Sequence, residues 1–162
     1  MVAGIISKQR PLFGVGFVAF GDMPQTRSTI KWMSIHVERF SGRVEEYARF
    51  RERYDPSIIL PLLNEWCGLL PEWTIADIAA GTGMLSDVFL ANGNRVLAVE
   101  PNAEMRGACR ELHEGEPQLE IMNGTAEATG LPDASVQMVA VGRALHWLDL
   151  YAMRLCESFG EC

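Results

Sequence analysis

Residues 74–86, Thr-Ile-Ala-Asp-Ile-Ala-Ala-Gly-Thr-Gly-Met-Leu-Ser, constrain the fold of this chain more than any other stretch. Their pattern predicts a short buried strand over residues 75–79, a turn of small residues, and a helix that starts near Gly83 or Met84. Gly81 and Gly83 permit backbone conformations that other residues resist, and they leave room for a ligand to approach the backbone. Asp77 places a carboxylate at the end of the strand. Together these features predict a nucleotide-type binding turn.

Gly-x-Gly spacing alone is weak support for that interpretation, because many such turns bind nothing. The next apolar run strengthens it. Residues 95–100, Arg-Val-Leu-Ala-Val-Glu, predict a second parallel strand that ends in Glu100. An acid at that place typically accepts hydrogen bonds from ribose hydroxyls, although an exposed acid at a strand end is the alternative. A dehydrogenase domain would need a third glycine in Gly-x-Gly-x-x-Gly, and Ser86 stands in its place.

The remaining elements alternate between helices and strands, which predicts an α/β fold with a parallel sheet buried on both faces. An earlier helix begins at Pro56, ends at Gly68, and is expected to kink at Pro61. Further along the chain, the patterns predict helices over residues 84–92 and 103–114 and strands over residues 119–122 and 136–141.

Four segments in the same order resemble the class I S-adenosylmethionine-dependent methyltransferases, in particular the small-molecule type with a His-Trp pair after the fourth strand. The segments are residues 77–83, 99–105, 124–127 with 131–135, and 143–147. The resemblance implies a Rossmann-like methyltransferase fold with about four parallel strands, in the order 3-2-1-4, flanked by helices. It also implies S-adenosyl-L-methionine as the cofactor and a small molecule as the methyl acceptor.

The resemblance further implies a set of cofactor-binding residues that follow the first, second and third strands of the sheet. These are Asp77, Gly81, Gly83, Glu100, Thr125, Ala126 and Glu127. The residues of the first turn would surround the methionine moiety, Glu100 would take the ribose hydroxyls, and Ala126 with its neighbours would flank the adenine. Met105 would pack nearby, unless it is part of the helix core.

The N-terminal part, residues 38–70, resembles the cap helices of the family, which close over the cofactor. Tyr47, Arg51 and Tyr54 match the cap pattern. Arg51 would face the cofactor carboxylate, which a planar guanidinium can bind with two hydrogen bonds. The alternative is an amphipathic helix that buries its apolar side and keeps its charges in water.

His146 and Trp147 follow the fourth strand, on the side where ligands gather in open α/β sheets. The imidazole of His146 titrates near neutral pH, so it is a candidate to orient or deprotonate an acceptor hydroxyl, with Trp147 as a wall of the pocket. The alternative is a packed His-Trp pair that only fixes the loop.

Three residues depart from the pattern of the family. Ala79 replaces a usual glycine, Thr125 stands where an aspartate usually accepts a hydrogen bond from the adenine, and Gln137 replaces an aspartate common in the fourth strand. A hydroxyl accepts more weakly than a carboxylate, so we expect weaker cofactor binding than in the family.

The domain organisation inferred from these patterns has two parts. Residues 1–32 are expected to be a disordered or spurious leader outside the fold, a poor signal peptide being the alternative. Residues 33–162 are expected to be a partial methyltransferase domain, with the cofactor-binding half at 74–147 and a tail at 148–162 that no longer resembles the family. The missing strands would leave the fourth strand as an open edge, through which the chain could self-associate.

Composition excludes several classes of partner. The formal net charge of -7 and the absence of a basic run argue against nucleic acid. The apolar run at residues 12–20 is too short to span a bilayer. The four cysteines have no Cys-x-x-Cys spacing and the three histidines are scattered, so we expect no metal site, and thiols that stay reduced in the cytoplasm. The alternative to an enzyme is a non-catalytic methyltransferase fragment that acts as a binding or regulatory module.

Overall fold

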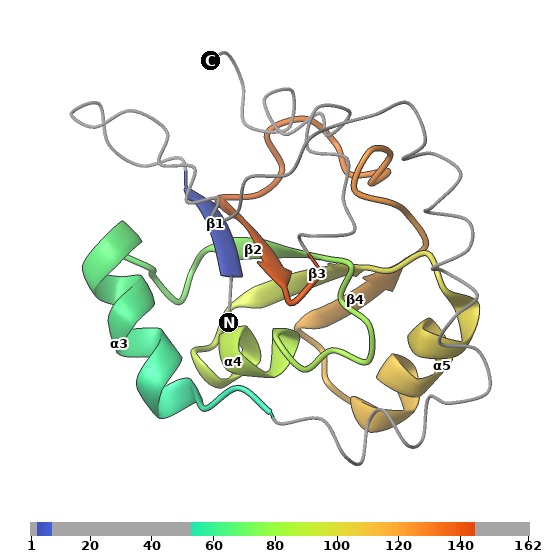
Figure 1. Ribbon diagram of the computed structural model, residues 1–162, viewed down its shortest axis with the longest axis horizontal. Coiled ribbons are helices and arrows are strands. Elements are labelled where there is room, and N and C mark those ends of the chain that lie inside the picture. Colours follow the sequence, from blue (N-terminus) through green and yellow to red (C-terminus); the bar gives the residue numbers. More distant parts are fainter. Residues whose placement is uncertain (1–2, 8–52, 145–162) are drawn as a thin grey trace.

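The structure, a computed structural model, describes residues 3–7 as backbone and residues 53–144 in full (Figure 1). After the first strand, the described helices and strands alternate as far as β4, which is followed by β5 without a helix between them. In order they are β1 (Ala3–Ser7), α3 (Pro56–Cys67), β2 (Thr74–Ile78), α4 (Ser86–Ala91), β3 (Arg95–Val99), α5 (Ala103–Leu112), β4 (Leu119–Met122) and β5 (Met138–Gly142).

These strands form one sheet in the order β1-β5-β2-β3-β4. The four strands β5, β2, β3 and β4 are parallel, with Ile75 of β2 opposite both Val96 of β3 and Met138 of β5. The predicted α/β fold and the predicted order of its four parallel strands are therefore confirmed. Parallel neighbours bring the carboxyl ends of the strands to the same edge of the sheet.

Strand β1 was not predicted, and it changes the edge of the sheet. It pairs antiparallel with β5, from Ala3 opposite Gly142 to Ser7 opposite Met138. The prediction that residues 1–32 take no part in the fold is therefore wrong for residues 3–7. The prediction that the fourth strand is an open edge is also wrong, because β1 satisfies its backbone groups. The prediction that the chain self-associates was based on an exposed fourth strand, and that basis is removed by the pairing with β1.

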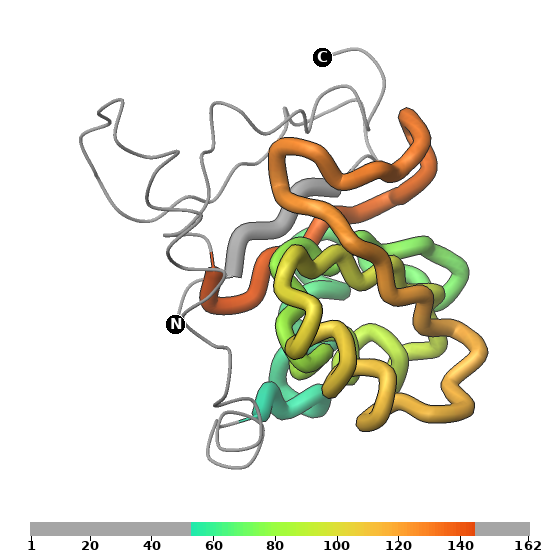
Figure 2. Tube along the Cα trace, turned by 90° about the vertical axis from the view of Figure 1, so that its right-hand side faces the viewer, coloured from blue at the N-terminus to red at the C-terminus, as the bar shows by residue number. Residues whose placement is uncertain are grey.

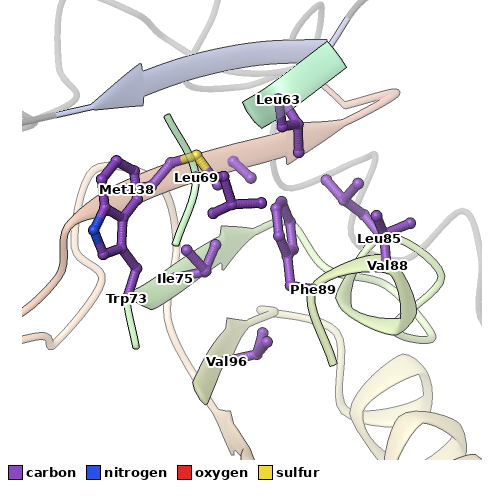
Figure 3. Packing of buried hydrophobic residues seen from close by; sticks show 10 residues of the cluster. Leu63, Leu69, Trp73, Ile75, Leu85, Val88, Phe89, Val96 and Met138 are labelled. Atoms are coloured by element: carbon purple, nitrogen blue, oxygen red, sulfur yellow. The ribbon is translucent and has the colours of Figure 1, made fainter. Parts of the chain in front are cut away.

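One face of the sheet packs against α3 and α4 (Figure 3). The buried side chains come from alternate positions of the strands, as a pleated sheet requires. Phe89 of α4 lies between the helices and Ile75 and Val96 of the sheet, and it is 1% exposed. Fully burying a side chain of this kind contributes roughly 1.5–3 kcal/mol to folding. The core thus fixes the helix that follows the glycine turn.

The opposite face of the sheet has a second apolar cluster, which includes Ile78, Val99 and Val139. Among the described residues, the long segment between β4 and β5 covers this cluster with Ala126, Val136 and Leu131. Figure 2 shows this segment in orange as a long excursion before the chain returns to β5. The segment that was predicted to flank the adenine is therefore anchored in the core.

Helix α3 has the ends that the sequence predicts. Asp55 is its N-cap and accepts a hydrogen bond from the Ser57 N–H, Pro56 occupies the first turn, and Gly68 ends the helix with a left-handed φ of 65°. The helix runs through Pro61. Of the helices in the described part of the chain, none combines the length and the apolar character that crossing a bilayer requires.

Candidate functional site

The candidate site lies where β2 and β3 end. Ile78 and Val99 are opposite each other at these ends, so the turn after β2 and the acid after β3 are neighbours. The Ala80 N–H donates to the Val99 carbonyl at 3.2 Å, which ties the start of the turn to the end of β3. The parallel sheet therefore brings together two segments that are about twenty residues apart.

The turn itself uses left-handed backbone conformations at three positions. φ is 56° at Ala79, 60° at Gly81 and 86° at Gly83. A side chain added at Gly81 would meet no atom of the described residues within 4 Å, so this part of the structure leaves the turn open there. Because residues 81–85 form turns, α4 begins at Ser86, later than the predicted start. The left-handed φ values explain why glycine stands at two of these positions.

Glu100 holds the turn in place from the end of β3. Its Oε2 accepts a hydrogen bond from the Gly81 N–H at 2.9 Å, and its Oε1 accepts one from the Asn102 N–H at 2.8 Å. Glu100 is only 8% exposed, so the alternative of an exposed acid is wrong. Burial raises the pKa of its carboxyl, while the hydrogen bonds from Asn102 and Gly81 oppose that rise.

Asp77 is more deeply buried, at 1% exposed. The Ser86 hydroxyl donates to its Oδ2 at 2.7 Å, and among the described residues its Oδ1 has no hydrogen-bond partner. Burial, opposed by the Ser86 hydrogen bonds and reinforced by the charge of Glu100, raises the pKa of Asp77 to about 7. A buried oxygen without a partner costs free energy, so it marks a place where a ligand can supply the missing donor.

Thr82 was missed by the sequence analysis. Its side chain is 2% exposed, and its Oγ1 is a second buried oxygen that lacks a hydrogen-bond partner in the described part of the chain. Thr82 lies between Gly81 and Gly83, and its hydroxyl is the only chemical signal that the sequence offered. Two buried oxygens that lack partners among the described residues thus lie at this turn, Asp77 Oδ1 just before it and Thr82 Oγ1 within it.

Asn102, also missed, positions the next helix. Its Oδ1 accepts from the N–H groups of Glu104 at 2.9 Å and Met105 at 3.0 Å, so it is the N-cap of α5. An asparagine directly before a helical pattern was the signal that could have revealed it. Met105 is buried, which supports the helix-core interpretation of that residue.

The third predicted group of site residues, Thr125, Ala126 and Glu127, lies in the segment after β4. The Thr125 hydroxyl accepts a hydrogen bond from the Ala128 N–H at 3.2 Å, so it closes a local turn. The Ala126 methyl is buried in the second apolar cluster. Gly124 precedes them in a crowded place, because an added Cβ would lie 2.7 Å from the Thr129 carbonyl oxygen and 2.8 Å from Val99 Cγ1.

Gln137 lies at the amino ends of the strands, opposite the carboxyl ends that carry the candidate site. Its Oε1 accepts from the Thr74 N–H at 2.8 Å, and its own N–H donates to the Thr74 carbonyl at 3.0 Å. Thr74 is the first residue of β2. The departure at position 137 therefore serves the start of β2, at the opposite end of that strand from the glycine turn.

Tyr54 is the last of the three residues that match the cap pattern and the only one of them within the described part of the chain. The guanidinium carbon of Arg143 lies 4.7 Å from the centroid of its ring. An added Cβ at Gly142 would be 2.9 Å from the Tyr54 hydroxyl. Tyr54 thus packs at the carboxyl end of β5. The other predicted residues of the cap and of the catalytic pair, Tyr47, Arg51, His146 and Trp147, lie outside the described residues.

Comparison with known proteins identifies related sequences. The profile of a family described as "Methyltransferase domain" matches residues 76–159. An uncharacterized methyltransferase of Mycobacterium tuberculosis is 38% identical over 112 residues, which are 68% of this chain and 42% of that protein. An uncharacterized methyltransferase of Schizosaccharomyces pombe is 29% identical over 109 residues, 67% of this chain and 42% of that protein. The chain therefore spans about two fifths of the length of these relatives.

Solved structures agree with these sequences. A candidate type II methyltransferase from Anaeromyxobacter dehalogenans is similar with a TM-score of 0.50 and 30% identity, over 64% of this chain and 41% of that one. A candidate S-adenosyl-L-methionine-dependent methyltransferase from Methanococcus maripaludis has a TM-score of 0.51 at 14% identity, over 83% of this chain and 59% of that one. The second likeness shows the fold alone.

Proposed function

Because the chain belongs to the methyltransferase-domain family, we propose that it forms the cofactor-binding part of an S-adenosyl-L-methionine-dependent methyltransferase whose acceptor is a small molecule. The observation that carries this proposal is the hydrogen bond between the Gly81 N–H and Glu100 Oε2 at 2.9 Å. It joins the two motifs on which the resemblance depends, the glycine turn and the acid after the next strand.

The residues at this edge fit the chemical groups of the cofactor. S-adenosyl-L-methionine carries an ammonium group, and Asp77 offers a buried carboxylate oxygen without a partner among the described residues. Its ribose has hydroxyl donors, and each Glu100 oxygen that accepts from the backbone retains a second lone pair. The open space in front of Gly81 allows close approach to the backbone.

When bound, the cofactor supplies a methyl group on a positively charged sulfur. Transfer to an acceptor is an in-line displacement, so the protein mainly aligns the two molecules and excludes water. In this proposal, Glu100 and Asp77 fix the donor. His146 orients the acceptor or takes its proton, and Tyr47 and Arg51 close over the site.

Charge and thiol chemistry support the class of acceptor and the location. The formal net charge of -7 disfavours a polyanionic acceptor such as nucleic acid. Cys67 and Cys109 are free thiols, as expected of a protein in a reducing compartment. We therefore propose a small acceptor and a cytoplasmic location.

Binding of S-adenosylhomocysteine, measured by isothermal titration calorimetry with the full chain, tests the proposal. We expect saturable binding that E100Q weakens at least tenfold, because hydrogen bonds to a charged group contribute about 1.5–3 kcal/mol. E111Q is the matched control, since Glu111 is exposed on α5 and should leave the affinity unchanged.

Three outcomes distinguish the alternatives. Binding that E100Q alone weakens supports the assigned site. No binding by the wild-type chain, although it unfolds cooperatively on heating, contradicts the proposed function. Binding without methyl transfer from labelled S-adenosyl-L-methionine to a panel of small hydroxyl, amine and thiol acceptors favours the binding-module alternative.

A further inference from the structure

A second polar cluster, outside the candidate site, joins three parts of the fold. Nε2 of His113, at the end of α5, lies 2.8 Å from Oδ1 of Asp87 in α4. Nη1 of Arg53, ahead of α3, lies 2.9 Å from the other carboxylate oxygen of Asp87. One carboxylate is therefore shared by two basic side chains, and the His113 side chain is only 8% exposed.

His113 also lies against the glycine turn. A Cβ built on Gly83 would be 2.6 Å from Cε1 of His113 and 2.9 Å from Sγ of Cys109. Real side chains do not approach so closely, so the turn contacts the imidazole only because residue 83 has no side chain. The ring thus supports the turn from the side of α5, while Gly81 leaves the turn open.

Hydrogen bonds fix the orientation of the ring at both nitrogens. Nδ1 lies 2.8 Å from the Cys109 carbonyl oxygen, and Nε2 lies against the Asp87 carboxylate. Both neighbours are acceptors, so the ring satisfies both when it is protonated and donates twice. The Asp87 hydrogen bond, with a smaller contribution from Cys109, raises the pKa of His113 to about 10.

We propose that His113 is a positioning residue for the glycine turn: held by Asp87, it keeps Gly83 in the conformation that binds the cofactor, without itself touching the cofactor. The inference rests on the proposed function and adds a residue to it. Within residues 53–144, the titratable and charged groups that face His113 are Asp87 from α4, with Arg53 on its other oxygen, and Cys109 from α5.

The test measures the affinity of the full chain for S-adenosylhomocysteine by calorimetry, at a temperature at which every variant is folded. We expect H113A to weaken binding at least tenfold, and H113Q, which retains one donor for Asp87, to recover part of that loss. N94A is the matched control. Asn94 Nδ2 donates to the carbonyls of Leu70, Pro71 and Trp73, away from the turn, so N94A lowers stability without affecting the affinity.

A pH profile separates positioning from a general loss of stability. In D87N the imidazole lacks its carboxylate partner, so its pKa returns toward its ordinary value of 6.5. We expect the affinity of D87N, relative to wild type, to fall severalfold between pH 6 and pH 8. In the H113A background, the same D87N change should produce no such fall. This double variant is the control for the charge of Asp87, which also raises the pKa of Asp77.

The two proposals fail in different ways. If the wild type binds S-adenosylhomocysteine and both H113A and D87N bind within twofold of it at each pH, the positioning role is wrong and the proposed function stands. If the wild type does not bind, both are wrong. Where H113A does not fold, H113Q and the D87N profile decide the matter by the same criteria.

Discussion

The Ser86 hydroxyl donates a hydrogen bond of 2.7 Å to Oδ2 of Asp77, whereas Oδ1 has no hydrogen-bond partner among the described residues. Asp77 is the fourth residue of β2, and Ser86 is the first residue of α4. The contact therefore spans the whole glycine turn. It leaves a largely desolvated acid that titrates near neutrality, with a pKa of about 7.

D77N should change how stability depends on pH. A carboxyl whose pKa is raised in the folded state from 3.8 to about 7 loses stability as the pH rises through that window. Across that window, each pH unit lowers the free energy of unfolding of the wild type by up to about 1.4 kcal/mol. The amide of D77N does not titrate, so the variant lacks this pH dependence. We therefore expect the midpoint of thermal unfolding of D77N, relative to wild type, to be higher at pH 8 than at pH 5.

The matched control for this prediction is D133N, because Asp133 is exposed between β4 and β5. The midpoint of thermal unfolding of D133N should differ from that of the wild type by the same amount at pH 5 and at pH 8. An equal difference for D77N at pH 5 and pH 8 would show that Asp77 is not the group that titrates. D77N should also bind S-adenosylhomocysteine less tightly than the wild type at pH 8, because it lacks the carboxylate charge.

A79G should stabilise the chain and improve cofactor binding. Ala79 has a φ of 56°, a left-handed conformation that costs a residue with a side chain roughly 1–2 kcal/mol. Glycine removes most of this strain at the position where the family usually has it. We expect a higher midpoint in urea unfolding and tighter binding of S-adenosylhomocysteine.

A134G is the control for that gain. Ala134 has a φ of 54° but lies in the segment between β4 and β5, away from the turn. It should stabilise the chain by a similar amount and leave the affinity unchanged. A gain in affinity with both variants would mean that stability, and not the shape of the turn, limits binding.

The sequence was sufficient to predict the parallel part of the sheet because each strand there is a nearly continuous apolar run. Residues 119–122 were predicted to the residue, and the other strands to within about two residues. The glycine turn and the acid after the next strand are also local patterns, so the sequence could propose a candidate site at the carboxyl ends of these strands. Such features are local, and local patterns are what a single sequence records.

The parts that were missed depend on contacts between distant residues. Strand β1 pairs Ile5 with Ala140 and Ile6 with Val139, and nothing in a short run near the N-terminus names a partner so far along the chain. His113 was regarded as one of three scattered histidines, because its role arises from contacts with Asp87 and Gly83. Asn94 carries no signal in the sequence, although its side-chain amide donates to the carbonyls of Leu70 and Trp73 in the loop before β2.

Two glycine-to-alanine changes should have opposite effects on stability. Gly107 lies inside α5, and a Cβ there would meet no atom of residues 53–144 within 4 Å, so G107A should stabilise the chain by about 0.5–1 kcal/mol through helix propensity. G124A places a Cβ 2.7 Å from a backbone carbonyl oxygen and 2.8 Å from Val99. Neither neighbour is the end of a flexible side chain, so the segment after β4 must shift, at a cost of typically about 1–3 kcal/mol. Urea unfolding of both variants measures the difference, and G124A at least as stable as wild type would show that the segment does not pack on Val99 as described.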